Sequence, residues 1–213
     1  MKRLFLVRHG ETDWNREGRF QGRMDVPLND VGLRQAEAAT CALKGIPFDR
    51  ILSSGLSRAL QTARPLARTI PGVEIEIDDD LSEIAHGLWE GRTAGEVEAV
   101  FPGALVQWHT NPQTVVMPQG ESLEDVGDRA WPALMRIARG EGETVAIFSH
   151  DAVLKVLLMK VLDCPLSSFW RFQLANGSIT LLELCDRGWR IPLMGEAGHL
   201  GSVFGGRAEQ KGL

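Results

Sequence analysis

A short apolar run near the start of the chain ends on a cation and an imidazole. Residues 4–7 are followed directly by Arg8-His9-Gly10-Glu11-Thr12. If the run is a strand of an open α/β sheet, Arg8 and His9 lie at its carboxyl end, where such sheets bind ligands. A guanidinium can hold a phosphoryl group while a neutral imidazole attacks phosphorus. The motif therefore predicts a phosphate site with His9 as the nucleophile.

Two further predicted strand ends carry polar residues. They are Ser53-Ser54, with Arg58 in the helix that follows, and Ser149-His150-Asp151. Parallel strands place their carboxyl ends at one edge of a sheet, so we expect two histidines and two arginines to meet there. Helix N-termini at that edge would add backbone N–H donors for an anion. The second imidazole, His150, is suited to donate to a phosphoryl oxygen.

A leaving alkoxide needs a proton, and a carboxylic acid on a neighbouring loop is the natural donor. The candidate is Glu83, in the sequence Leu81-Ser82-Glu83-Ile84. Burial against Trp89 would raise the pKa of this carboxyl group. The acidic run at residues 78–80 is interpreted as a solvated turn, with its aspartates as the alternative donors.

Apolar strands alternate with helical patterns along the chain, which predicts an α/β fold. The expected strands are residues 4–7, 50–53, 73–77, 144–148, 178–184 and 189–193, and the expected helices are 33–43, 57–69, 96–101, 121–139 and 151–162. We expect a three-layer sandwich, in which a mostly parallel central sheet has helices on both faces and the last two strands form a hairpin. Ser57 and either Asn29 or Asp30 are expected to cap helices, and Pro132 is expected to kink or break its helix.

The whole chain, residues 1–213, is expected to form one domain. Its irregular segment at residues 92–120 is rich in Pro, Gly and Trp. We expect this segment to form a cap over the sheet edge and to select the substrate. The small polar tail at residues 205–213 is expected to be mobile.

The composition excludes several classes of function. A net charge of −5 argues against a nucleic-acid surface, although a small pocket can still be locally basic. Cys41, Cys164 and Cys185 lack the even number and the CxxC spacing of a disulfide framework or a zinc site. No signal peptide or membrane span is apparent. We therefore expect a cytoplasmic monomer or homodimer with no nucleic-acid or membrane partner.

Taken in order, these motifs resemble the histidine phosphatase superfamily. The resemblance rests on Arg8-His9-Gly10-Glu11-Thr12, Asn15, Gln21-Gly22, Asp25, Pro27-Leu28, the segment 53–59, Thr62-Ala63, Glu83, the segment 87–91 and Ser149-His150. It implies that fold over nearly the whole chain and an enzyme that needs no metal or other cofactor. It also implies a phosphohistidine at His9 and a general acid at Glu83 that later acts as the base for water. The implied phosphate contacts are Arg8, Arg58, His150 and Asn15, and the implied substrate-side contacts are Gln21 and Gly22.

Within the superfamily the resemblance favours phosphatases, because phosphoglycerate mutases usually have longer chains and a small hydroxyl residue where Gln21 stands. The segments 169–172, 176–178 and 199–201 resemble the metal-independent phosphoserine phosphatases, in which a late histidine reaches the substrate. This likeness implies that His199 contacts the substrate. The expected substrate is a small phosphorylated metabolite, either phosphoserine or a broad set of phosphomonoesters. An α-ribazole phosphatase and a 2,3-bisphosphoglycerate-dependent phosphoglycerate mutase remain alternatives.

Asp151 stands where many members of the superfamily have glycine. It would lie in the first turn of a helix, where the dipole favours a carboxylate. Alternatively, it would meet an ammonium or hydroxyl group of the substrate. Two other function classes fit less well. A module that only binds phosphorylated ligands would not need both histidines, both arginines and Glu83, and a metallohydrolase would need ligand patterns such as HxH or HExxH, which the sequence lacks.

Overall fold

The computed structural model describes residues 1–203, so the predicted mobile tail lies outside the described residues. Its strands are β1 (Lys2–Arg8), β2 (Arg50–Ser53), β3 (Ile75–Ile77), β4 (Thr144–Ser149), β5 (Ile179–Cys185) and β6 (Gly188–Glu196). Its α-helices are α1 (Asp13–Glu17), α2 (Asp30–Ala42), α3 (Ser57–Arg68), α4 (Ala94–Val100), α5 (Ala104–Thr110), α6 (Leu123–Arg139) and α7 (Asp151–Val161). The 3-10 helices are η1 (Asp79–Leu81), η2 (Gly87–Trp89), η3 (Pro112–Thr114), η4 (Leu166–Ser168) and η5 (Gly198–Val203).

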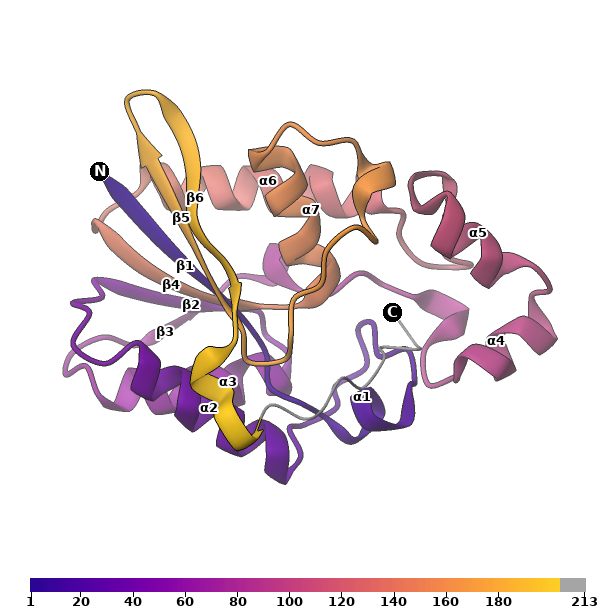
Figure 1. Ribbon diagram of the computed structural model, residues 1–213, viewed down its shortest axis with the longest axis horizontal. Coiled ribbons are helices and arrows are strands. Elements are labelled where there is room, and N and C mark those ends of the chain that lie inside the picture. Colours follow the sequence, from indigo (N-terminus) through magenta and orange to yellow (C-terminus); the bar gives the residue numbers. More distant parts are fainter. Residues whose placement is uncertain (204–213) are drawn as a thin grey trace.

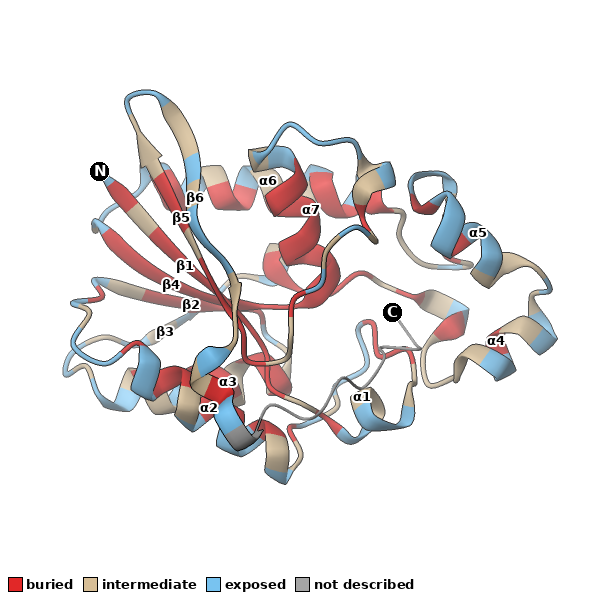
Figure 2. Ribbon diagram, viewed as in Figure 1, coloured by how far each residue is buried: buried red, intermediate tan, exposed pale blue. Residues whose placement is uncertain are grey.

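The strands form one sheet in the order β3-β2-β4-β1-β5-β6. The neighbours among β1 to β4 pair in parallel, whereas β5 pairs antiparallel with both β1 and β6. The predicted mostly parallel sheet with a late hairpin is therefore confirmed. Strand β4 is buried along its whole length, which explains its unbroken apolar sequence. Figure 2 shows this buried centre of the sheet in red.

Helices cover both faces of the sheet, as predicted, with α2 and α3 on one face and α6 and α7 on the other (Figure 1). Successive residues of β1 point to opposite faces. Leu4 and Leu6 therefore belong to the core under α6 and α7, and Phe5 and Val7 belong to the core under α2 and α3. Because both faces are covered, the edge formed by the carboxyl ends of the strands is left for a site.

The predicted break at Pro132 and the predicted cap at Ser57 are both wrong, whereas a kink at Pro132 stays a prediction. Pro132 does not break α6, which runs without interruption from Leu123 to Arg139. The side chains of Ala133 and Leu134 next to it are fully buried, so their packing offsets the hydrogen bond that proline cannot donate. Ser57 is also not the cap of α3, because Leu56 holds that position and the Ser57 hydroxyl donates to Asp25 instead. The expected cap Asn29 is confirmed at the start of α2.

The segment at residues 92–120 contains α4, α5 and η3, and it lies beyond the carboxyl ends of the central strands (Figure 1). Trp108 of α5 is fully buried, and the indole Nε1–H of Trp170 donates to the Trp108 backbone carbonyl at 2.7 Å. This contact joins the segment to the chain after α7. Among residues 1–203, no helix is long and apolar enough to cross a bilayer. The cytoplasmic location and the monomeric or dimeric state stay predictions.

Candidate active site

The polar ends of three strands meet at one edge of the sheet. Arg8 at the end of β1 is in register with Ser149 at the end of β4, and the His9 amide donates to the Ser149 carbonyl at 3.0 Å. The His9 and His150 rings lie with their centroids 5.1 Å apart. The third strand end contributes Ser54, whose hydroxyl is 2.6 Å from Nε2 of His150. The parallel register therefore brings both predicted histidines together.

A small cavity that is open to solvent lies at this edge. Its wall includes seven residues that the sequence had indicated, namely Arg8, His9, Asn15, Gln21, Gly22, Arg58 and Glu83. Trp14, Gly18 and Arg19 complete the wall. The cations of this wall are the guanidinium groups of Arg8, Arg19 and Arg58. Guanidinium groups suit the bidentate binding of an anion.

The orientation of the His9 ring leaves one nitrogen for chemistry. Nδ1 lies 2.7 Å from the carbonyl oxygen of Gly10, so this nitrogen carries the proton and donates. Nε2 is then the ring nitrogen with the lone pair. Burial, together with the charges of Arg58 and Arg8, holds the pKa of His9 well below its usual range. The imidazole is therefore neutral near pH 7, which is the state a nucleophile requires.

Backbone carbonyls hold both guanidinium groups in place. Arg58 donates to Met24 at 2.9 Å and to Gly22 at 2.8 Å, and Nη1 of Arg8 donates to Leu174. The Nε–H groups of both arginines are buried without a partner among residues 1–203. Burial lowers the pKa of Arg58 to about 10, which still leaves it charged at neutral pH. The two side chains are thus fixed cations with unused donors.

Glu83 is a buried carboxyl group, 3% exposed, on the loop between η1 and η2. Burial raises its pKa above the usual range, and the charge of Asp151 raises it further. These effects exceed the opposing influence of the Ile84 amide, which donates to Oε1 at 2.9 Å, and of the nearby arginines. Such a group retains a proton at higher pH than a free carboxyl group, as a general acid requires.

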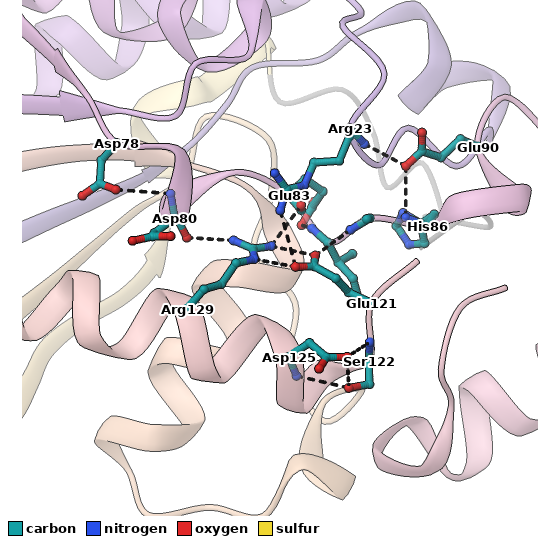
Figure 3. A network of polar contacts seen from close by, with 12 residues as sticks. Arg23, Asp78, Asp80, Glu83, His86, Glu90, Glu121, Ser122, Asp125 and Arg129 are labelled. Atoms are coloured by element: carbon teal, nitrogen blue, oxygen red, sulfur yellow. Dashed lines mark hydrogen bonds and ion pairs between the residues drawn. The ribbon is translucent and has the colours of Figure 1, made fainter. Parts of the chain in front are cut away.

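A salt bridge from α6 holds the loop that carries Glu83. Arg129 donates to the Glu83 carbonyl at 3.1 Å and to the Asp80 carbonyl at 2.7 Å (Figure 3). Its guanidinium also pairs with the Glu121 carboxylate at 2.7 and 2.9 Å. Oε2 of Glu121 also accepts from the Ala85 amide, at 2.8 Å. The loop is therefore tied on both sides of Glu83.

Glu90 connects this loop to the substrate side of the cavity. Its Oε1 accepts from the backbone amides of Arg23, at 2.9 Å, and His86, at 3.1 Å (Figure 3). Gly22 has a φ of +51°, and a Cβ built there would lie 2.0 Å from the same oxygen. Only glycine fits this position, both because of its left-handed backbone and because of the close approach.

Asn15 and Gln21 present amide groups to the cavity. Oδ1 of Asn15 accepts from the Thr12 amide at 3.1 Å, and Oε1 of Gln21 accepts from the Thr12 hydroxyl at 2.9 Å. With both oxygens engaged, the NH₂ groups of these side chains are the ends left to donate to an anion.

Comparison with known proteins identifies the family. A family model described as histidine phosphatase superfamily (branch 1) matches residues 4–197. The chain belongs to this superfamily. It is 32% identical over 205 residues to phosphoserine phosphatase 1 of Hydrogenobacter thermophilus, covering 96% of this chain and 97% of that protein. It is 33% identical over 187 residues to an adenosylcobalamin/α-ribazole phosphatase of Salmonella typhimurium, covering 86% and 91%.

A solved structure with this fold is Bacillus stearothermophilus YhfR, which superposes with a TM-score of 0.89 at 35% identity, over 94% of this chain and 100% of that one. These findings confirm the predicted superfamily and fold class. They also confirm the predicted reaction class, because the chain is a phosphatase of the histidine phosphatase superfamily. The named relatives differ in their substrates, so the likeness alone does not choose one.

Two predicted substrate contacts of this histidine phosphatase, His150 and His199, are not among the residues that line the cavity. Nδ1 of His199 lies 2.7 Å from the Glu196 carboxylate, and Nε2 lies 3.0 Å from the Gly177 carbonyl. Both ring nitrogens are therefore engaged by the protein. The Gly177 amide in turn donates to the carbonyl oxygens of Arg8 and His9 at 3.0 and 3.2 Å. His199 is thus linked through Gly177 to the backbone of Arg8 and His9, and its contact with a substrate stays a prediction.

Several residues around the site were not indicated by sequence reasoning. Glu121 and Arg129 hold the Glu83 loop, and Lys155 lies fully buried behind Arg8. The one available signal was the position of Lys155 inside the apolar run of α7, where a buried cation needs a partner. Among the described residues, no group of three or more His, Cys, Asp and Glu is arranged to hold a metal ion.

Proposed function

We propose that the chain hydrolyses phosphomonoesters of small metabolites through a phosphohistidine at His9. The observation that carries the proposal is the His9 ring itself. Its Nδ1 is fixed on the Gly10 carbonyl, and the ring lies in the cavity wall with Arg8 and Arg58. A neutral nucleophile between two fixed cations is suited to attack a phosphoryl dianion, whose own charge repels nucleophiles in water.

In the first step, the Nε2 lone pair of His9 forms a bond to phosphorus while the bond from phosphorus to the leaving oxygen breaks. Glu83 transfers its proton to that oxygen, so the product leaves as an alcohol. Arg8, Arg58 and the Asn15 amide bind the phosphoryl oxygens. The Nδ1 atom of His150 has no partner among residues 1–203 and is the ring nitrogen left for a phosphoryl oxygen.

In the second step, the Glu83 carboxylate takes a proton from water, and the water oxygen attacks phosphorus. The bond from phosphorus to Nε2 breaks, inorganic phosphate is released, and His9 returns to its neutral form. No step requires a metal or another cofactor. The same carboxyl group acts first as acid and then as base, and burial favours this exchange because it raises the pKa of Glu83 above its usual range.

The first candidate substrate is phosphoserine, because the relative named phosphoserine phosphatase 1 aligns over nearly the whole of both chains. The second candidate is α-ribazole phosphate, supported by the Salmonella relative. Gln21, Gly22, Trp14 and Arg19 line the same cavity, which supports them as the contacts of the alcohol portion of the substrate. A mutase reaction would require the phosphohistidine to persist while one product leaves and the next acceptor binds. The open cavity is compatible with a broad range of phosphomonoesters.

Rapid-quench labelling tests the mechanism. The protein is mixed briefly with ³²P-labelled substrate in EDTA, and the label is mapped after digestion. We expect acid-labile label at His9 in the wild-type protein and none in His9→Ala. His109→Ala, a change at an exposed histidine of α5, is the matched control and should label normally. Label at another residue, or a requirement for added metal, would contradict the mechanism.

A substrate panel then assigns the alcohol portion. It contains phosphoserine, α-ribazole phosphate, 3-phosphoglycerate and p-nitrophenyl phosphate, with a mutase assay primed by 2,3-bisphosphoglycerate. The highest kcat/KM among the natural esters identifies the substrate class. Efficient mutase activity would replace the phosphatase proposal and would leave the phosphohistidine step intact.

A further inference from the structure

A row of three charged side chains is buried behind the phosphate site. Asp151 lies between Arg8 and Lys155, with Oδ1 at 3.1 Å from Nη1 of Arg8 and Oδ2 at 2.7 Å from Nζ of Lys155. The side chains of all three residues are at most 1% exposed. The distances are those of ion pairs, although the angles miss linear hydrogen-bond geometry. Buried charges are costly unless they are paired, so this row demands an explanation.

Asp151 does not line the cavity. It is fully buried, and each of its carboxylate oxygens faces a cation of the protein. The sequence-based alternative, in which Asp151 binds an ammonium group of the substrate, is therefore not what this geometry supports. Its place in the first turn of α7 agrees with the dipole argument, but the ion pair with Arg8 is the stronger contact.

Lys155 is fixed as firmly as its partner. It follows Asp151 by one helical turn, and its Nζ lies 4.8 Å from the ring centroid of Phe169 and 5.0 Å from that of Trp170. A cation above two aromatic faces gains electrostatic stabilisation that helps to replace its lost hydration. The aromatic pair therefore keeps Lys155 charged beside the carboxylate.

The arrangement separates anchoring from charge. A carboxylate next to Arg8 holds the guanidinium, but by itself it would cancel the positive charge that a phosphoryl group feels. A second cation on the far side of the carboxylate restores that charge. We propose that Asp151 and Lys155 are positioning residues for Arg8: Asp151 anchors the guanidinium, and Lys155 offsets the carboxylate so that Arg8 retains its attraction for phosphate. This inference rests on the proposed phosphate-binding function of Arg8.

The pair also acts on the proposed acid. Asp151 raises the pKa of Glu83, whereas Arg8, Arg58 and the Ile84 amide lower it. Removing the charge of Lys155 leaves the Asp151 carboxylate less compensated and should raise the pKa of Glu83 further. Removing both charges of the pair should lower it. In a plot of kcat against pH, the alkaline limb would then move to higher pH when Lys155 alone loses its charge, and to lower pH when both residues lose theirs.

The decisive measurement is calorimetric binding of inorganic phosphate, which requires no turnover. Lys155→Met keeps the length of the side chain and its contact with the aromatic pair. We expect it to fold and to bind phosphate about tenfold more weakly, as the loss of one nearby charge in a poorly screened site allows. Lys160→Met, at an exposed position of the same helix, is the matched control and should bind like wild type.

The second variant, Asp151→Leu combined with Lys155→Met, replaces the pair by apolar side chains of similar size, a change that buried pairs often tolerate. In this variant the net charge of residues 8, 151 and 155 is the same as in the wild-type protein. We expect this variant to bind phosphate more tightly than Lys155→Met alone and to show a lower kcat than wild type, since Arg8 has lost its anchor.

Two results would overturn the inference: Lys155→Met binding phosphate like the control, or the double variant binding no more tightly than Lys155→Met. A wild-type protein that binds no phosphate overturns it as well. Failure of the phosphatase proposal has a separate signature, namely phosphate binding with the expected charge dependence but no phosphohistidine and no hydrolysis.

Discussion

His86 should make the protein lose stability as the pH falls, and replacing it by Phe should remove that part of the loss. The ring is fully buried against Phe20, with a centroid distance of 5.1 Å, and neither nitrogen has a partner among residues 1–203. Burial, reinforced by the charge of Arg58, lowers the pKa of His86 to about 3. The group therefore stays neutral in the folded protein at every pH of practical interest.

The sign and the size follow from proton linkage. In the unfolded chain His86 has an ordinary pKa of about 6.5, so below that pH only the unfolded state gains a proton and stability falls. Each pH unit below 6.5 costs about 1.4 kcal/mol until the folded pKa is reached. Between pH 7 and pH 5 this single residue should lower the free energy of unfolding by about 2 kcal/mol.

Urea unfolding of the wild-type protein and His86→Phe at both pH values measures the effect. The variant should be more stable than wild type at pH 5 by about 2 kcal/mol beyond its difference at pH 7. A poor fit of the larger ring would change the free energy of unfolding of the variant equally at pH 5 and at pH 7. It therefore cannot produce a difference that depends on pH. His86→Leu, with a different shape, should give the same pH-dependent gain. A difference that does not change with pH would refute the linkage argument.

Three other substitutions test the site and its supports. Glu83→Gln should lower kcat by about 10²–10⁴ for alkyl phosphates and much less for p-nitrophenyl phosphate, whose leaving group needs no proton; equal losses would assign the acid elsewhere. Gly22→Ala should cost more stability in urea than Gly45→Ala, because both have positive φ but only Gly22 meets Glu90; equal costs would mean that the loop moves freely. Arg129→Met should lower the free energy of unfolding by about 2–4 kcal/mol and reduce kcat most for alkyl phosphates; an unchanged ratio of alkyl to aryl rates would leave it a purely structural role.

The part of the site that follows from parallel strands could be predicted from sequence alone. His9 and His150 each end an apolar run, and the parallel register of two such strands puts both rings at one edge without further information. Glu83 is different, because its loop has no regular element to fix its direction. The residues alone left the aspartates at 78–80 as alternatives to Glu83, and the contacts of Arg129 and Glu121 that hold its loop depend on packing between distant segments.

Other side-chain directions could not be predicted for the same reason. The motif that contains His199 does not fix the direction of its ring. That direction is set by the Glu196 carboxylate, three residues away, and by the Gly177 carbonyl, 22 residues away. Asp151 and Lys155 have the spacing of an ordinary helical ion pair, which is usually on the surface and of little consequence. Their burial depends on how α7 packs against β1, and no local pattern reports that.

The charges buried at the site explain how a chain with a net charge of −5 can bind a phosphate ester. Arg8, Arg58 and Lys155 contribute three positive charges and Asp151 one negative charge, the imidazole rings of His9 and His150 are neutral, and the proposed first step begins with Glu83 protonated. Two positive charges remain, which matches a phosphomonoester dianion. When Glu83 gives its proton to the leaving group, the site loses one positive charge, and it regains that charge when the carboxylate takes a proton from water in the second step. The site therefore carries the same charge when inorganic phosphate forms as when it binds the ester.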